Sequence, residues 1–204
     1  MQTLVRFFSE LYPWPERKPE VPSNWHGWFS EPNQTMLRGL LSESTRVIVE
    51  LGAWCGVSTK FLLDQAPNAT VISIDHWLGS KEHQKEEFSQ ILPNLYETFL
   101  VNLWDDRKRL IPLRANTVEG LENLHQWRIC VDLTYIDASH EYEEVFCDIK
   151  TAIDLFPNST ICGDDWSWGD VRRAVEEISE IKQKTSHTLG EQVWWFSNSN
   201  ENNS

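Results

Sequence analysis

The stretch from Val47 to Gly56 restricts the possible folds of this chain more than any other. It reads VIVELGAWCG, so an apolar run ends at Glu50 and leads into a turn with glycine at Gly52 and Gly56. A helix-forming pattern follows over residues 57–66. A buried strand that leads through a glycine turn into a helix brings bare backbone N–H groups against a ligand. The stretch therefore predicts a ligand site at the carboxyl end of a strand.

A second apolar run, residues 70–75, follows this helix pattern and ends in the carboxylate of Asp75. An acid at the tip of the second strand of such a unit accepts the hydroxyls of a ribose. Dinucleotide-binding turns carry a glycine at the place of Trp54, so that a pyrophosphate can approach. Tryptophan there suits a ligand without phosphates. We therefore expect an adenosine-containing ligand that contacts Trp54 and is not a dinucleotide.

Short apolar runs alternate with amphipathic patterns along the rest of the chain. Strands are predicted at 46–51, 70–75, 110–115, 131–137 and 159–164. Helices are predicted at 57–66, 86–104, 141–155 and 169–184. This alternation is typical of a parallel sheet covered by helices on both faces. Segments 186–190 and 192–196 leave no room for a helix between them, so we expect Gly190 to turn an antiparallel hairpin.

The chain divides into three parts by composition. Residues 1–45 are rich in proline and aromatic residues and are expected to be irregular, with a short helix around 34–41. The aromatic residues there are either packing anchors or a cover over the ligand pocket. Residues 46–196 form the ligand-binding domain. The polar tail, 197–204, is expected to be disordered.

Composition limits the function further. The chain has 204 residues and a net charge of −13, which is unfavourable for a nucleic-acid partner. We find no apolar stretch long enough to span a membrane and no signal peptide, so we expect a cytoplasmic protein. The four cysteines form no Cys-x-x-Cys pair and are expected to be reduced thiols. If the protein is a homodimer, we expect Trp194, Trp195 and the N-terminal aromatic residues to supply its interface.

Polar residues follow all five predicted parallel strands, where open α/β sheets bind their ligands. These residues are Glu50, Asp75, Asn116, Asp137 and the pair Asp164–Asp165. Tips of neighbouring strands lie about 5 Å apart, so the last three carboxylates converge if those strands are neighbours. Such carboxylates repel unless a cation joins them, and Mg²⁺ prefers oxygen ligands. The alternative is that Asp164–Asp165 cap the next helix, although Asp170 lies nearer its start.

The string from Glu50 to Ser58 resembles motif I of the class I S-adenosylmethionine (SAM) methyltransferases, and especially the catechol-type, metal-dependent O-methyltransferases. The resemblance spans residues 34–196. It implies a Rossmann-like, mostly parallel seven-stranded sheet with a C-terminal antiparallel hairpin. It also implies SAM contacts: Gly52 and Gly56 near the methionine part, Glu50 and Ser58 near its amino acid end, Asp75 at the ribose, and His76, Trp77 and Asn116 at the adenine. For Trp77 the alternative is a place in the core.

The same family supplies an interpretation of the acidic strand tips. Asp137 with Asp164 and Asp165 resembles its metal triad, although the last ligand is often asparagine there, which leaves the third ligand open. His140 occupies the place of a lysine that takes the proton of the acceptor hydroxyl, and histidine can do this because its pKa lies near neutrality. The pattern Asp-x-x-His-x-Tyr also resembles bacterial methyltransferases of sugars and natural products. The alternative for His140 is a surface residue at a helix start.

We therefore expect a SAM-dependent methyltransferase that O-methylates a small hydroxylated molecule with a divalent cation such as Mg²⁺. Asp137 and His140 are its expected catalytic residues. Two alternatives remain. One is a metal-independent or nitrogen-directed methyltransferase, in which the acidic pair serves only structure. The other is a non-catalytic or NAD-binding protein of the same fold.

Overall fold

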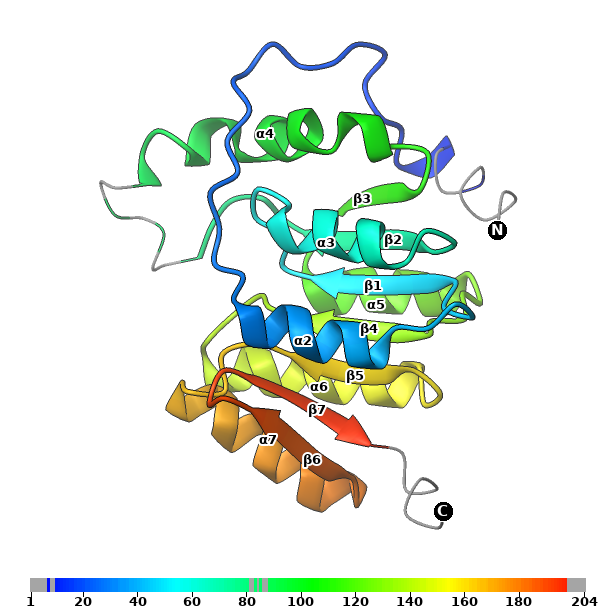
Figure 1. Ribbon diagram of the computed structural model, residues 1–204, viewed down its shortest axis with the longest axis vertical. Helices are drawn as coiled ribbons and strands as arrows, with labels where there is room; N and C mark the ends of the chain where they lie inside the picture. The colour runs from blue at the N-terminus through cyan, green and yellow to red at the C-terminus, as the bar shows by residue number, and fades with distance from the viewer. Residues whose placement is uncertain (1–6, 8–9, 81–82, 84, 86–87, 198–204) are drawn as a thin grey trace.

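The computed structural model describes residues 7, 10–80, 83, 85 and 88–197. Its framework is a seven-stranded sheet in the order β3-β2-β1-β4-β5-β7-β6 (Figure 1). The strands are β1 (Val47–Leu51), β2 (Thr70–Asp75), β3 (Leu110–Arg114), β4 (Leu133–Ile136), β5 (Thr160–Gly163), β6 (Thr185–Leu189) and β7 (Val193–Ser197). The first five pair in parallel, and β7 runs antiparallel to both β5 and β6.

The C-terminal hairpin forms where the sequence predicts it. Gly190 adopts φ +63° in the turn between β6 and β7, a conformation that glycine adopts at no steric cost. Ser197, which was assigned to the disordered tail, belongs to β7; residues 198–204 lie outside the described residues. The fold is thus the Rossmann-like arrangement expected from the resemblance.

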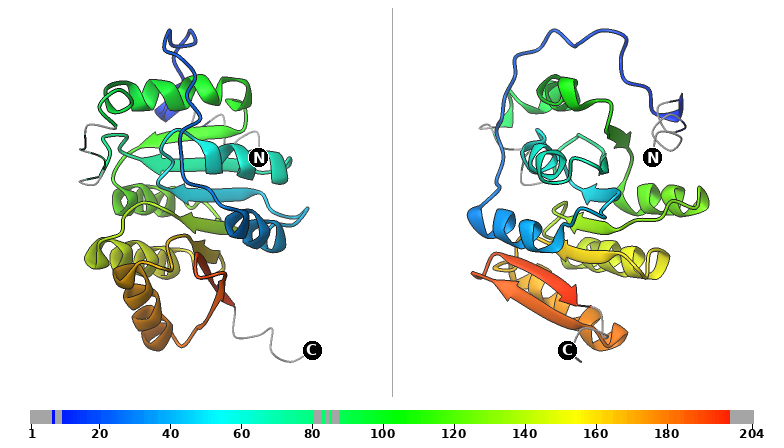
Figure 2. Two further views of the ribbon diagram at one scale, coloured as in Figure 1. Left: turned by 60° about the vertical axis from the view of Figure 1, so that its left-hand side comes forward. Right: turned by 45° about the vertical axis from the view of Figure 1, so that its right-hand side comes forward.

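Helices cover both faces of the sheet (Figure 2). They are α2 (Glu31–Leu40), α3 (Val57–Gln65), α4 (Leu95–Asn102), α5 (Thr117–Gln126), α6 (Tyr142–Leu155) and α7 (Gly169–Lys182). Apolar side chains of α5, α6 and α7 form one core with the strands, and those of α2, α3 and α4 form a second. The β1 strand is buried at every position, as a strand covered on both faces must be.

Three helices differ from the sequence-based expectation. The α5 helix was not predicted, because Gly120 in its middle is a poor helix former. A Cβ at Gly120 would lie 2.5 Å from Ile74 Cγ2, so close packing on β2 requires glycine there. The regular part of the predicted helix 86–104 is only α4, and the described residues before it form the short 3₁₀ turn Leu92–Asn94 around Pro93. The α2 helix starts earlier than expected, with Pro32 in its first turn.

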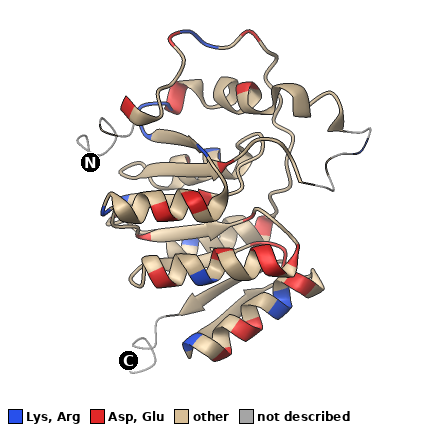
Figure 3. Cartoon of the chain, turned by 180° about the vertical axis from the view of Figure 1, so that it is seen from behind, with Lys and Arg blue, Asp and Glu red and all other residues tan. Residues whose placement is uncertain are grey.

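The charge is distributed over the whole chain. Acidic positions occur on helices throughout the described structure, with basic positions interspersed among them (Figure 3). In the part of the chain that the structure describes, every helix is too short or too polar to cross a bilayer.

The sheet topology fixes where a ligand can bind. The β1 strand pairs with β2 on one side and with β4 on the other, so the chain reverses its direction of winding beside β1. Crossover loops then leave in opposite directions and open a crevice at the carboxyl ends of these strands.

Candidate functional site

The glycine turn after β1 packs directly against the tip of β4. Gly52 has φ +82°, and a Cβ there would lie 2.0 Å from the carbonyl oxygen of Asp137. Gly56 has φ +89° and starts α3 as its N-cap residue; a Cβ there would lie 2.6 Å from Leu103 Cδ1. Both positions therefore require glycine, for conformation and for space. The turn brings motif residues and β4 residues to one place.

Asp75 holds this turn in place. Its Oδ2 accepts hydrogen bonds from the backbone N–H groups of Ala53 at 2.9 Å and Trp54 at 3.1 Å, and its Oδ1 accepts from Trp77 N–H at 2.6 Å. A carboxylate oxygen has two lone pairs, so Oδ1 retains capacity for another donor. The predicted contact with ribose hydroxyls stays a prediction, and the structure adds a second task for the same side chain.

A cavity of about 830 Å³ opens in front of the turn, at the carboxyl ends of the strands. Most of the predicted site residues line it. They are Gly52, Trp54, Ser58, Asp75, His76, Asn116, Asp137, His140, Asp164 and Asp165. The structure therefore brings together residues from five separate strand ends, as the sequence predicts.

Glu50 does not reach the cavity. Its carboxyl group is fully buried and accepts hydrogen bonds from the hydroxyls of Ser58 at 2.6 Å, Thr59 at 2.5 Å and Ser73 at 2.6 Å. Burial raises its pKa to about 7, although the three hydroxyls oppose this increase. The interpretation of Glu50 as a direct ligand contact is therefore corrected, since it ties α3 to β1 and β2. Ser58 itself lines the cavity, although its hydroxyl donates to Glu50.

Of the two places that the sequence left open for Trp77, at the ligand or in the core, the structure shows the core. Its side chain is 2% exposed, packs on Tyr96 and Phe99 at ring distances of 4.8 and 4.9 Å, and donates from Nε1 to the carbonyl of Trp54. The neighbouring His76 is exposed at the cavity, and its Nδ1 accepts from Leu78 N–H. The sequence alone did not show which of the two side chains faces the cavity. The alternation of side chains between the two faces of a strand ends with β2 at Asp75.

Asn116 lines the cavity and also starts a helix. Its side-chain oxygen accepts a hydrogen bond from Val118 N–H at 3.2 Å, so it is the N-cap of α5. The sequence analysis did not predict this capping role, because it did not predict α5. The predicted contact with adenine remains untested.

An aromatic cluster forms another wall of the cavity. Its members are His26, Trp28, Trp54, His83 and Phe88, with ring centroids between 4.3 and 6.1 Å apart. Trp54 donates from Nε1 to His26 Nδ1 at 3.0 Å. The N-terminal aromatic residues were expected to be either packing anchors or a cover over the pocket. Trp28 lines the pocket and therefore belongs to the cover. Trp14, in contrast, is an anchor that bonds the carbonyl of Leu110 on β3.

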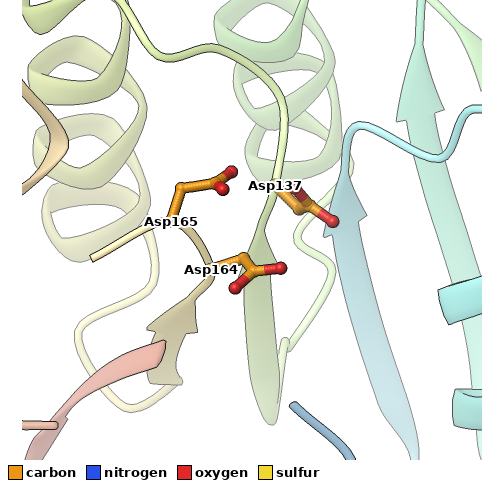
Figure 4. Close-up of side chains that lie close together, drawn as sticks. All are labelled: Asp137, Asp164 and Asp165. Atoms are coloured by element: carbon orange, nitrogen blue, oxygen red, sulfur yellow. The ribbon is translucent and has the colours of Figure 1, made fainter. Parts of the chain in front are cut away.

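The carboxylates of Asp137, Asp164 and Asp165 converge at the ends of β4 and β5 (Figure 4). One oxygen of each lies within 4.8 Å of those of the other two. The sheet register explains this, because Asp137 N–H bonds to Leu51 O and Asp164 N–H bonds to Ile136 O, which continues the parallel ladder. Neither Asp170 nor this pair caps α7, which starts after Trp168 without a side-chain cap.

Burial and mutual repulsion raise the proton affinity of two of these acids. The pKa of Asp137 is well above its usual value because the group is desolvated and lies near Asp164 and Asp165. The pKa of Asp164 is raised to about 6 for the same two reasons. A positive ion in their midst would remove the repulsion.

His140 adjoins the acidic cluster. Its Nε2 lies 2.8 Å from Asp165 Oδ2, and its ring stacks on Trp168 at 4.3 Å with an interplanar angle of 14°. The ring is thus held at the cavity by two residues from the loop after β5. Sequence analysis proposed His140 but missed Trp168, for which no spacing rule gives a signal.

Sequence analysis also missed two buried polar residues, Tyr135 and Asn33, that contact these acids. Tyr135 on β4 is buried, and its hydroxyl lies between Asn33 Oδ1 at 2.9 Å and Asp137 Oδ2 at 3.3 Å. Tyr135 was predicted only as part of a strand. Asn33 lies in the N-terminal segment, far from every motif, so the sequence contained no signal for it.

Comparisons with known proteins agree with this geometry. A family profile described as a methyltransferase domain matches residues 49–166, from β1 to the loop after β5. No curated protein matches the chain.

Three solved structures illustrate the structural similarity. One, from Staphylococcus aureus and assigned as a caffeoyl-CoA O-methyltransferase, has 15% identity and a TM-score of 0.62 over 97% of this chain and 92% of that one. The TomG O-methyltransferase of Streptomyces achromogenes, in complex with SAM, has 14% identity and a TM-score of 0.60 over 97% and 89%. An O-methyltransferase of Bacillus cereus, in complex with S-adenosylhomocysteine (SAH), has 16% identity and a TM-score of 0.57 over 96% and 97%.

At this level of identity the structures establish the fold, and the profile match over more than half of the chain establishes the family. The glycine turn, the acid at the tip of β2 and part of the cavity between them lie within the matched region. The chain belongs to the methyltransferase-domain family and has the fold of the class I SAM-dependent methyltransferases.

Proposed function

We propose that this methyltransferase transfers the methyl group of SAM to a hydroxyl of a small molecule, with the help of a divalent cation. The observation that carries the proposal is the convergence of Asp137, Asp164 and Asp165 beside His140, in the cavity that also contains the glycine turn. The O-methyltransferases of similar structure support it by their described activity.

The acidic cluster has the chemistry that a hard cation requires. Its ligand atoms are carboxylate oxygens, which Mg²⁺ and Mn²⁺ prefer. Two of the acids, Asp137 and Asp164, have raised pKa values because they are desolvated and lie near other carboxylates. Asp137 and Asp164 are the ligands we propose first, with Asp165 shared between the cation and His140. A cation held by these residues would lower the pKa of an acceptor hydroxyl and fix its position.

The protein residues have separate tasks in this scheme. Gly52, Trp54 and Asp75 bind SAM and hold its methyl group toward the acidic cluster. His140 takes the proton of the acceptor hydroxyl, and Asp165 stabilises the resulting imidazolium through Nε2. As the acceptor oxygen forms its bond to the methyl carbon, the bond from that carbon to sulfur breaks and SAH leaves with the electron pair. Positioning the two reactants in line provides much of the rate enhancement.

The aromatic cluster suits a planar or ring-shaped acceptor in the same cavity. Trp28 and Trp54 present large apolar surfaces there, and His140 with Trp168 presents another stacked pair. We therefore infer a small hydroxylated ring compound, with two neighbouring hydroxyls as the group that a cation would chelate.

Two measurements on the purified protein, each in Mg²⁺ and in EDTA, test the cofactor and the cation. One is a binding titration with SAM and SAH, and the other is an assay of SAH release. We expect binding of SAH in both solutions, and release of SAH from SAM with a vicinal diol such as catechol only in Mg²⁺. Asp137→Ala should abolish the Mg²⁺-dependent activity and retain SAH binding. Equal rates in EDTA would instead favour a metal-independent or nitrogen-directed methyltransferase. If folded protein bound neither SAM nor SAH, the proposal would be wrong.

A further inference from the structure

Asn33 is a buried polar residue on a helix face that is otherwise apolar. It lies in α2, where Met36 and Leu37 share its side of the helix at the i+3 and i+4 positions, and it is 0% exposed. An amide in such a place costs free energy unless its hydrogen bonds are made. A leucine would pack there more simply, so the polar group must have partners that require it.

Those partners include an acid of the proposed metal site. The Asn33 Nδ2 donates to Asp164 Oδ2 at 2.8 Å and to Ser30 Oγ at 3.0 Å, which uses both of its hydrogens. The Asn33 Oδ1 accepts from the Tyr135 hydroxyl at 2.9 Å, and that hydroxyl also lies 3.3 Å from Asp137 Oδ2. One amide thus bonds Asp164 directly, and the Tyr135 hydroxyl that donates to it lies next to Asp137.

The orientation of this amide follows from its neighbours. Asp164 can only accept a hydrogen bond when it is ionised, so the nitrogen of Asn33 must face it and the oxygen must face Tyr135. The hydroxyl of Tyr135 has one proton, and the shorter of its two distances is to Asn33. Ser30 closes the arrangement on the helix side.

We propose that Asn33 is a positioning residue for the metal site: it fixes the orientation of Asp164, and the Tyr135 hydroxyl, whose proton its Oδ1 accepts, fixes the orientation of the amide. The inference rests on the proposed function. It assigns a task to the N-terminal segment, since Asn33 lies outside the matched region 49–166. A carboxylate whose oxygen is held by a donor presents one geometry to a cation, and loss of such a support lowers metal affinity roughly 10–100-fold in known metal sites.

The test is a calorimetric titration of the full chain with Mn²⁺ alone, for wild type, Asn33→Leu and Asn102→Leu. Asn102 is a matched control: it also ties the N-terminal segment to the domain, through Asn24 and the carbonyl of Cys55, and does not contact the acids. We expect Asn33→Leu to weaken Mn²⁺ binding roughly 10–100-fold. We expect Asn102→Leu to lower the melting temperature and leave Mn²⁺ affinity unchanged. The electron paramagnetic resonance spectrum of bound Mn²⁺ should broaden only in Asn33→Leu.

The possible failures are distinct. If wild type does not bind Mn²⁺, the proposed metal-dependent function is wrong and this inference with it. If wild type and a folded Asn33→Leu bind Mn²⁺ equally, the inference alone is wrong. Should Asn33→Leu not fold, Tyr135→Phe removes the hydroxyl between Asn33 and Asp137 and keeps the ring. We expect it to weaken Mn²⁺ binding several-fold, and an unchanged affinity would overturn the inference.

Discussion

Asp165 Oδ2 lies 2.8 Å from Nε2 of His140, which makes the third acid of the cluster a partner of the proposed base. The same carboxylate also has an oxygen within 4.8 Å of Asp137 and Asp164. Asp165 adopts φ +64°, a conformation that non-glycine residues adopt rarely and that directs its side chain away from a regular strand path. The tip of β5 thus directs Asp164 toward Asn33 and Asp165 toward His140.

The first prediction concerns His140. We expect His140→Gln to lower the rate of SAH release roughly 10²–10⁴-fold, because the glutamine cannot take the proton of the acceptor hydroxyl. Affinity for SAH should remain within a factor of about two, since the proposed SAM contacts are on other strands. Both quantities are measured on one preparation, by a rate assay with catechol and by calorimetry.

His187→Gln is the matched control. His187 also stacks on a tryptophan, Trp195 at 5.4 Å with an angle of 18°, but lies on β6 at the edge of the sheet. Its replacement should leave the rate unchanged. If both variants had equal activity, His140 would not be the base.

The second prediction concerns Asp75. Asp75→Asn replaces one acceptor oxygen by a donor in front of backbone N–H groups of Ala53, Trp54 or Trp77, so the glycine turn should loosen. We expect SAH affinity to fall at least tenfold, which corresponds to about 1.4 kcal/mol. Calorimetry measures the affinity, and thermal unfolding measures the loss of stability.

Asp132→Asn separates these two effects. Asp132 Oδ2 accepts from the backbone N–H groups of Arg46 at 2.7 Å and Val47 at 2.9 Å, at the opposite end of β1. Its replacement should destabilise the fold without changing SAH affinity. Similar losses of affinity in both variants would show that Asp75 acts only through stability.

Local sequence patterns predicted most of the fold, because they reflect local causes. The runs that end at Glu50 and Asp75 are strands because apolar, β-branched residues fill a sheet covered on both faces. The hairpin follows from Gly190 and a short connection. The α5 helix was not predicted because it contains Gly120. The reason for a glycine there is its contact with Ile74, which is distant in sequence.

The candidate site could be predicted only where its residues follow strands. Asp137 and Asp164 were found because the tips of parallel strands meet at one edge of a sheet. Asn33 and Trp168 were not, since they reach the site from a separate helix and a loop whose paths depend on tertiary packing. Glu50 was misplaced because its position at a strand end does not reveal which way the side chain points.

The third prediction concerns the contact between the glycine turn and β4. Gly52→Ala places a methyl group 2.0 Å from the backbone oxygen of Asp137, in a left-handed conformation, so the turn or the tip of β4 must move. We expect a loss of at least about 3 kcal/mol in the free energy of unfolding. Chemical denaturation of Gly39→Ala provides the contrast: Gly39 is in α2 with no atom within 4 Å of a new Cβ, and alanine should stabilise it by about 0.5–1 kcal/mol. Equal stability of the two variants would contradict the tight contact at Gly52.

The fourth prediction concerns the pH dependence of stability that Glu50 causes. Its pKa is about 7 in the folded protein and 4.5 as a model value, so the folded state binds more protons between these values. The free energy of unfolding therefore decreases as the pH rises through this window, by about 3 kcal/mol in total, with no further loss from this group above it. Glu50→Gln cannot ionise, so its stability relative to wild type should rise by that amount between pH 4.5 and pH 8, as measured by urea unfolding. At pH 4.5 both side chains are largely neutral in the folded protein, so the difference there reports mainly the packing of the amide. A difference that stays constant up to pH 8 would mean that Glu50 titrates alike in both states.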